Sequence, residues 1–261
     1  MFEGIRTAAG RFVLLGLFAA LFEGFATGPR ASAGLPVDAE LVFAVDASDS
    51  MEDWEWRLEM AGIAAAFRSK PVQQVIASLP HQRIAVALLV WADARQQTDA
   101  SGWSVIEGKA SAEDFALTAG TWPRRASGGT GMGEGIAASV RLIERAPFVT
   151  SQRVIDVSGD GPEPLPLLTE HIVMMPGARA MAEKAHVTVN GLAILKDRSD
   201  LYEWYQDYVA DGPGAFVMQV KDIKDFAAAF QQKLLRELQL TVSRTEGGGA
   251  RQPGHAGPPA G

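Results

Sequence analysis

Short runs of apolar residues alternate with helix-length segments along almost the whole chain of 261 residues. The runs at 41–45 and 83–91 are largely apolar, which is typical of strands buried on both faces of a sheet. Between them, residues 55–68 repeat small and apolar side chains at helical spacing. Such alternation predicts a mostly parallel sheet, because a chain returns to the same direction by crossing over through a helix.

The same alternation continues to residue 240. Further strands are predicted at 103–107, 153–158, 187–195 and 215–220, and further helices at 111–119, 132–145, 177–185, 200–209 and 222–240. The expected fold class is therefore α/β, with a doubly wound, mostly parallel sheet and helices on both faces.

The first 33 residues have the pattern of a secretory signal peptide. Arg6 and Arg11 precede an apolar run at 12–22, and the small residues Ala31-Ser32-Ala33 follow it. The run is shorter than the roughly 20 apolar residues that a membrane-spanning helix needs. We therefore expect an exported protein, periplasmic or secreted, with no stable membrane span after cleavage of this signal.

This division gives three parts of the chain. Residues 1–33 are the signal peptide, and 34–243 form one α/β domain. Residues 244–261 are rich in glycine and proline without apolar periodicity, so we expect a disordered tail.

Composition excludes several classes of function. The 31 acidic residues outnumber the 24 basic ones, so the basic field of a typical nucleic-acid-binding protein is missing. The sequence contains no cysteine, which excludes disulfides, thiolate metal sites and a catalytic thiol.

Oxygen-bearing side chains gather in three predicted loops. Asp46, Ser48 and Ser50 follow the first strand at alternate positions, Thr130 lies in a glycine-rich loop, and Asp160 follows a later strand. In open parallel sheets, ligands bind beyond the carboxyl ends of the strands, where these loops can meet. Hydroxyl and carboxylate oxygens suit Mg²⁺, Mn²⁺ or Ca²⁺, and not zinc or copper.

This combination resembles the von Willebrand factor type A (VWFA) domain and its metal-ion-dependent adhesion site. The pattern of that family is Asp-x-Ser-x-Ser, then a later Thr, then an Asp in a Ser/Thr-Asp-Gly turn. The match here is made by Asp46, Ser48, Ser50, Thr130 and Asp160, and the resemblance covers about 41–240. The stretches RVIDVSGDGPE and VNGLAI resemble an uncharacterised exported bacterial branch of the family.

The resemblance implies a Rossmann-like VWFA fold and a role for each site residue. Ser48 and Ser50 would bind a divalent cation directly, Thr130 directly or through water, and Asp46 and Asp160 largely through water. We expect Mg²⁺ first, with Mn²⁺ or Ca²⁺ as alternatives. The implied function is an exported adhesion-type module that captures an Asp or Glu carboxylate of a protein partner through the cation, and not an enzyme.

Two other functions stay open at this point. One is a Mg²⁺-dependent hydrolase on a similar sheet, although Ser48 stands where a phosphohydrolase of the Asp-x-Asp type has its second acid. The other is a scaffold with a vestigial metal site, because Gly159 replaces the Ser or Thr that usually precedes the third-loop Asp.

Two further features lie close to these loops in the sequence. Trp54 and Trp56 cannot face the same way on a helix, so one belongs in the core and the other could join a partner surface. The stretch 162–176 follows Asp160 directly and is rich in proline and apolar residues, which suggests that it shapes the rim of the site.

Overall fold

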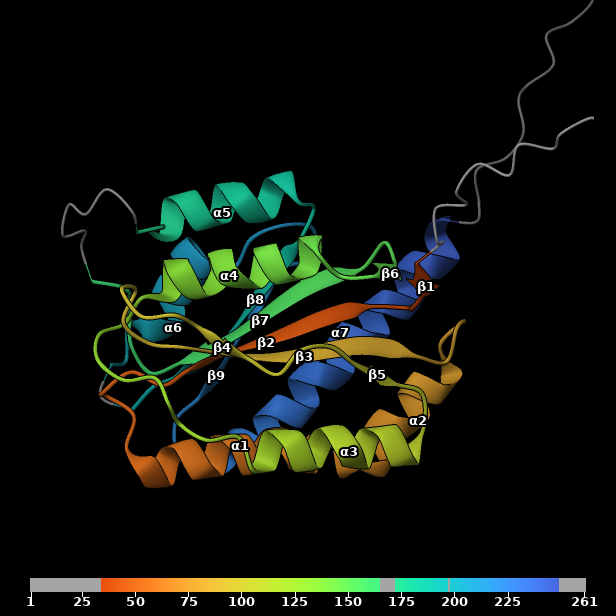
Figure 1. Ribbon diagram of the computed structural model, residues 1–261, viewed down its shortest axis with the longest axis horizontal. Helices are drawn as coiled ribbons and strands as arrows, with labels where there is room; N and C mark the ends of the chain where they lie inside the picture. Colours follow the sequence, from red (N-terminus) through yellow and green to blue (C-terminus); the bar gives the residue numbers. More distant parts are fainter. Residues whose placement is uncertain (1–33, 165–171, 197, 249–261) are drawn as a thin grey trace, which may run out of the picture. The chain divides into compact units, whose positions relative to one another are not determined.

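The computed structural model describes residues 34–164, 172–196 and 198–248, so the predicted signal peptide lies outside the described residues. A seven-stranded sheet forms the middle layer of the molecule, with helices above and below it (Figure 1). The path of neighbouring strands is β4 (Asp99–Ala100), β3 (Ile84–Trp91), β2 (Glu40–Asp46), β7 (Arg153–Gly159), β8 (Thr188–Ile194) and β9 (Val217–Val220). The seventh strand, β5 (Ser104–Ile106), pairs with β3 in the antiparallel direction, as β4 does.

Helices cover both faces of this sheet. One face carries α1 (Asp53–Arg68), α2 (Lys70–Ser78), α3 (Lys109–Gly120) and α7 (Phe226–Gly248), the last preceded by a 3-10 turn at Ile223–Asp225. The opposite face carries α4 (Met132–Glu144), α5 (Met175–Lys184), α6 (Leu201–Trp204) and a π-helical turn at Tyr205–Val209. The α/β fold class predicted from the sequence is confirmed.

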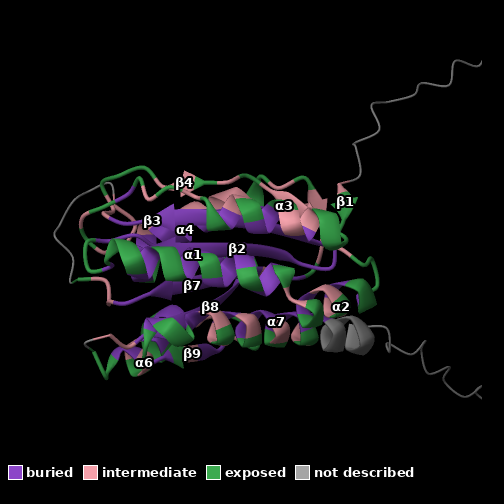
Figure 2. Cartoon of the chain, turned by 90° about the horizontal axis from the view of Figure 1, so that it is seen from below, coloured by how far each residue is buried: buried purple, intermediate pink, exposed green. Residues whose placement is uncertain are grey.

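The apolar runs of the sequence form the most deeply buried strands. Every residue of β2, β3 and β8 is buried, and Figure 2 shows the strands in the buried colour behind helices that also carry exposed residues. On the α1 face, Phe43 of β2 packs against Phe67, Phe115 and Phe230 with ring centroids 5.2–6.2 Å apart. Burial of such aromatic side chains is a large part of what stabilises the two layers.

Several elements differ from the sequence-based prediction. Helix α2 was not predicted, although Ser69 caps its first turn and Pro71 occupies an early helical position where its missing N–H costs nothing. Two short strands, β1 (Leu35–Pro36) and β6 (Phe148–Val149), form a separate parallel pair. Helix α7 continues to Gly248, so the first residues of the tail predicted to be disordered at 244–261 are helical, and 249–261 lie outside the described residues. No helix breaker precedes Gly247 in this helix.

The strand order places a topological switch point beside β2. Strand β2 pairs in parallel with β3 on one side and with β7 on the other. The chain therefore leaves β2 and β7 in different directions, and a crevice opens at their carboxyl ends, where open α/β sheets bind ligands. Among the described residues, no helix is long and apolar enough to cross a membrane.

Candidate metal centre

The first loop begins at the end of β2 and turns its oxygen atoms inward. Asp46 is fully buried, and its Oδ1 accepts a hydrogen bond of 2.7 Å from the backbone N–H of Ser48. The hydroxyls of Ser48 and Ser50 lie 3.0 Å apart, with Ser48 buried and Ser50 exposed. The alternation read in the sequence therefore brings the two hydroxyls together.

The third loop joins the first directly. Asp160 follows β7, and its Oδ1 accepts a 2.5 Å hydrogen bond from the Ser50 hydroxyl. A series of three hydrogen bonds thus connects Asp46 with Asp160 across the switch point. Two of them join the side-chain oxygens of Ser48, Ser50 and Asp160 in sequence, and the third joins the Asp46 carboxylate to the backbone N–H of Ser48.

Thr130 comes from the glycine-rich loop ahead of α4. This loop is joined to the first loop by two hydrogen bonds: Asp49 N–H donates to Gly128 O, and Gly128 N–H donates to Asp49 Oδ1. Thr130 Oγ1 lies 3.9 Å from the point where a Cβ on Gly161 would stand. The loop that carries Thr130 therefore borders both other loops, as the sequence predicted, although no hydrogen bond joins Thr130 to the four other predicted residues.

The carboxylates at this edge leave oxygen atoms without partners. Asp46 Oδ2 and Asp160 Oδ2 are buried and make no hydrogen bond to the described residues. Burial is the largest cause that raises the pKa of Asp46, to about 7, and burial also raises the pKa of Asp160. A bound cation would favour the ionised carboxylates and so oppose both shifts, and the donor set fits a hard divalent ion.

The fit depends on hydroxyls as much as on carboxylates. Within the described ranges, no three His, Cys, Asp or Glu side chains are arranged to hold a metal ion. A cation at this edge would therefore need the oxygens of Ser48, Ser50 and Thr130, which is a set for Mg²⁺, Mn²⁺ or Ca²⁺.

Two basic side chains hold the first loop by its carbonyls. Arg124 donates to Ala47 O at 3.2 Å and to Ser48 O at 2.7 Å, and it pairs with Asp53 at 2.9 Å. These contacts fix the backbone of the loop without placing the guanidinium on either of its carboxylates.

Lys196 also donates a hydrogen bond to a backbone carbonyl of the first loop. Its Nζ donates to Ser50 O at 3.0 Å and pairs with Glu55 at 2.6 Å. Sequence reasoning missed both Arg124 and Lys196, because each lies far along the chain and no local motif marks it.

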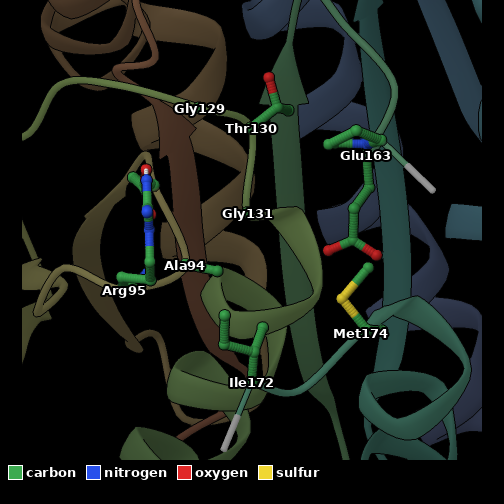
Figure 3. Close-up of a pocket in the computed structure, with 10 residues that line it drawn as sticks. Ala94, Arg95, Gly129, Thr130, Gly131, Glu163, Ile172 and Met174 are labelled. Carbon is green, nitrogen blue, oxygen red and sulfur yellow. Dashed lines mark hydrogen bonds and ion pairs between the residues drawn. The ribbon is translucent and has the colours of Figure 1, made fainter. Parts of the chain in front are cut away.

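A cavity of about 230 Å³ opens beside Thr130. Its walls are largely apolar, and Figure 3 shows Ala94 beside Arg95 at the left, Ile172 at the bottom, and Met174 beneath Glu163 at the right. Ile172 and Met174 belong to the stretch 162–176, so the described part of that stretch does border the site; its residues 165–171 lie outside the described part.

The two tryptophans that follow the first loop face opposite ways. Trp56 is 5% exposed and belongs to the core, whereas Trp54 is 41% exposed. Trp54 Nε1 donates to Glu52, which keeps the indole ring at the surface near the edge of the site.

Comparisons with known proteins agree with this geometry at the level of the fold. A protein family described as "Protein of unknown function (DUF1194)" matches residues 36–242. No curated protein matches the chain in sequence.

Two solved structures are similar in fold. The pilus adhesin SpaC from Lactobacillus rhamnosus GG, in its open conformation, matches with a TM-score of 0.55 and 13% identity over 80% of this chain and 30% of its own. Proximal thread matrix protein 1 from the mussel byssus matches with a TM-score of 0.50 and 14% identity over 79% of this chain and 47% of its own. The chain thus spans less than half the length of either protein, and the likeness supports a VWFA-like fold.

Proposed function

The chain belongs to the DUF1194 family, and we propose that it is a module that binds a protein partner through a divalent cation held at the carboxyl edge of the sheet. The observation that carries this proposal is the convergence of three loops at the switch point. There, Ser48, Ser50 and Asp160 form a continuous chain of oxygen groups, and two buried carboxylate oxygens lack partners.

The chain's own residues would share the work of holding the ion. The hydroxyls of Ser48 and Ser50 would bind it directly, Thr130 directly or through water, and Asp46 and Asp160 largely through water. Mg²⁺ is the first candidate because it prefers oxygen ligands and retains water readily, with Mn²⁺ and Ca²⁺ as alternatives. When bound, such an ion supplies a coordination position that attracts an anionic oxygen from outside.

The partner group that fits is the carboxylate of an Asp or Glu side chain on another protein. Neutral hydroxyls would leave the ion most of its positive charge, which favours capture of an anion. The cavity beside Thr130 offers a largely apolar surface for a side chain next to that carboxylate. That one protein of similar fold is named a pilus adhesin agrees with this proposal.

Binding is proposed in preference to turnover. Ser48 lies where a second acid would be needed for acid–base catalysis, and its hydroxyl is directed to Ser50.

We further propose that the protein is exported through the signal at 1–33 and acts in the periplasm or outside the cell as the domain 34–243.

Calorimetric titration with Mg²⁺ and with Mn²⁺ tests the proposal, using the chain from Gly34 onward. The parent should bind one ion, and the Ser48→Ala/Ser50→Ala variant should lose binding. Ser78→Ala is the matched control, because its exposed hydroxyl bonds only to Val75 O on α2. Failure of the parent to bind either ion at millimolar concentration would end the proposal.

A pull-down with immobilised acidic peptides, with and without chelator, then separates binding from a vestigial site. Peptide capture by the parent that is lost in chelator supports cation-dependent partner binding. If the parent and the Ser48→Ala/Ser50→Ala variant capture the peptide equally, the alternative of a scaffold with a vestigial metal site is favoured.

A further inference from the structure

Gly159 is the position where the chain departs from the VWFA pattern, and the structure shows what fills the space. A Cβ on Gly159 would lie 2.8 Å from Asp46 Oδ2 and 2.9 Å from the hydroxyl oxygen of Tyr205. Both distances are shorter than a side-chain carbon tolerates, so neither Ser nor Thr fits here while Asp46 and Tyr205 keep their places. The Tyr205 hydroxyl therefore lies beside the position where the pattern has a hydroxyl-bearing side chain.

Tyr205 reaches this point over a second glycine. A Cβ on Gly191 would lie 2.6 Å from Cδ1 of the Tyr205 ring, so the ring lies against the bare backbone of β8. Strand β8 pairs with β7, which carries Gly159. Two glycines on neighbouring strands thus make room for one phenol, which crosses from β8 to β7 and ends beside Asp46.

The backbone around Tyr205 is also unusual. The α-helical turn Leu201–Trp204 widens at Tyr205 into the π-helical turn Tyr205–Val209. Such turns are rare and occur frequently at functional sites, where they redirect a side chain.

The Tyr205 hydroxyl needs a hydrogen-bond partner, which the described residues do not supply. It is buried and makes no hydrogen bond to the described residues, and the same is true of Asp46 Oδ2 beside it. Phe would fill the same space and leave no polar atom unpaired, and an unpaired buried hydroxyl destabilises the folded state. A tyrosine is therefore an advantage only if its hydroxyl gains a partner in another state.

We propose that Tyr205 is a positioning residue of the metal site, whose hydroxyl donates to Asp46 Oδ2 when a divalent cation is bound. This inference rests on the proposed function. Ser48 N–H already donates to Asp46 Oδ1. A second donor on Oδ2 would hold the carboxylate in one orientation, as the outer hydrogen bonds of metal-binding carboxylates do in general.

The test compares Tyr205→Phe with the parent, both from Gly34 onward. Tyr208→Phe is the matched control, because it removes an exposed hydroxyl from the same π-helical turn. Calorimetry with Mg²⁺ and Mn²⁺ should give a dissociation constant at least about tenfold higher for Tyr205→Phe and an unchanged one for the control. The midpoint of thermal unfolding in chelator should stay the same or rise, because an unpaired hydroxyl has been removed.

Two results would overturn this role. One is a Tyr205→Phe dissociation constant within twofold of the parent's, and the other is a lower unfolding midpoint in chelator with unchanged metal affinity, which is the mark of packing alone. If the parent itself binds neither ion, the proposed function and this inference fall together. If the parent binds and Tyr205→Phe matches it, only the inference falls.

A second measurement avoids dependence on the folding of the variant. The chain has only three tyrosines, so labelling with ¹³Cζ-tyrosine gives few resonances. Saturating Mg²⁺ should shift the Tyr205 resonance and leave that of Tyr208 in place. A Tyr205 resonance that does not move while the ion binds would also overturn the inference.

Discussion

Among the buried acidic side chains of the described residues, two groups differ in whether the chain itself supplies a paired cation. The edge group lies at the carboxyl edge of the sheet and consists of Asp46, Glu59 and Asp160. The interior triad lies between β7 and α7 and consists of Asp156, Lys233 and Glu237. Buried carboxylates are costly unless they are paired, so the way each group is neutralised indicates its purpose.

The interior triad contains its own cation. Lys233 is fully buried, contacts Asp156 Oδ1 and lies 2.8 Å from Glu237 Oε1, which also accepts a hydrogen bond from Asn190. Burial alone would lower the pKa of Lys233, but the two carboxylates outweigh it and raise the pKa above its ordinary value. The ammonium therefore stays charged and gives the triad a positive charge from within the chain, although Asp156 Oδ2 and Glu237 Oε2 make no hydrogen bond to the described residues.

The edge group has no such partner. Arg124 forms its ion pair with Asp53, and Lys196 forms its ion pair with Glu55. Their charges lower the pKa of Asp46 and of Asp160 respectively, but burial outweighs them and both pKa values are raised. Among the described residues, no Lys or Arg forms an ion pair with the edge group. The comparison supports the proposal that the edge group holds an external cation, because the described residues give it no paired cation, whereas the interior triad contains one.

The largest effect is expected from removing the ammonium of the interior triad. Lys233→Met keeps the apolar stem but leaves Asp156 and Glu237 buried without a cation. Breaking a buried ion pair in this way typically costs about 3–5 kcal/mol of the free energy of unfolding. Urea denaturation measures it at pH 7, with Lys224→Met as the control, since Lys224 is exposed and its loss should cost less than about 0.5 kcal/mol.

A loss below about 1 kcal/mol for Lys233→Met would contradict the comparison. It would mean that Asp156 and Glu237 stay buried without a paired cation at little cost in the free energy of unfolding, as the edge group does. Metal affinity of the folded variant should be unchanged, because no metal-site residue contacts Lys233.

The sequence was informative about the edge group, and in the triad it favoured a structural hydrogen bond for Asp156 but did not identify Lys233 and Glu237 as its neighbours. Asp46 and Asp160 each follow a buried apolar strand, so the topology alone brings them to one edge. Lys233 and Glu237 lie four residues apart on α7, which is also the spacing of an ordinary surface ion pair. Periodicity could not reveal that this pair faces the core, because the charges interrupt the apolar pattern that would mark it.

The roles of Tyr205 and Gly159 beside the site could not be predicted from the sequence either. Tyr205 lies far from Asp46 in sequence, and its position depends on the π-helical turn, for which the sequence carried no recognised signal. Gly159 was read as a weakness of the motif, whereas its bare Cα is what admits Tyr205. Such features depend on three-dimensional packing between elements, which residue spacing does not encode.

A smaller effect, of opposite sign, is expected for Glu59 of the edge group. Its Oε1 accepts a hydrogen bond from Ser158, and burial is the main cause that raises its pKa from 4.5 to about 8. A carboxylate whose pKa is raised on folding lowers stability as pH rises from about 4.5 to about 8. Glu59→Gln removes that charge and keeps an acceptor for Ser158, so it should be more stable than the parent at pH 8 by about 1–3 kcal/mol.

The measurement is urea denaturation in chelator at pH 4.5 and pH 8. The two proteins should be nearly equal in stability at the lower pH and differ at the higher one. Glu237→Gln in the interior triad is the matched control, and it should be destabilised at both values. A Glu59→Gln variant less stable than the parent at pH 8 would remove the distinction between the two groups.

The smallest effect is expected for Arg124, which donates hydrogen bonds to the backbone of the first loop and forms its ion pair with Asp53. Arg124→Gln removes the donors to Ala47 O and Ser48 O, so the first loop should be less well ordered before the ion binds. We expect a dissociation constant for Mg²⁺ about fivefold higher, equivalent to about 1 kcal/mol. The neighbouring Arg125→Gln is the control, because Arg125 pairs with Asp99, away from the loop, and its loss should leave Mg²⁺ affinity unchanged. Tighter Mg²⁺ binding by Arg124→Gln would mean that the guanidinium acts mainly as a competing positive charge near Asp46, and then the chain would after all supply part of the counter-charge that the comparison assigns to an external cation.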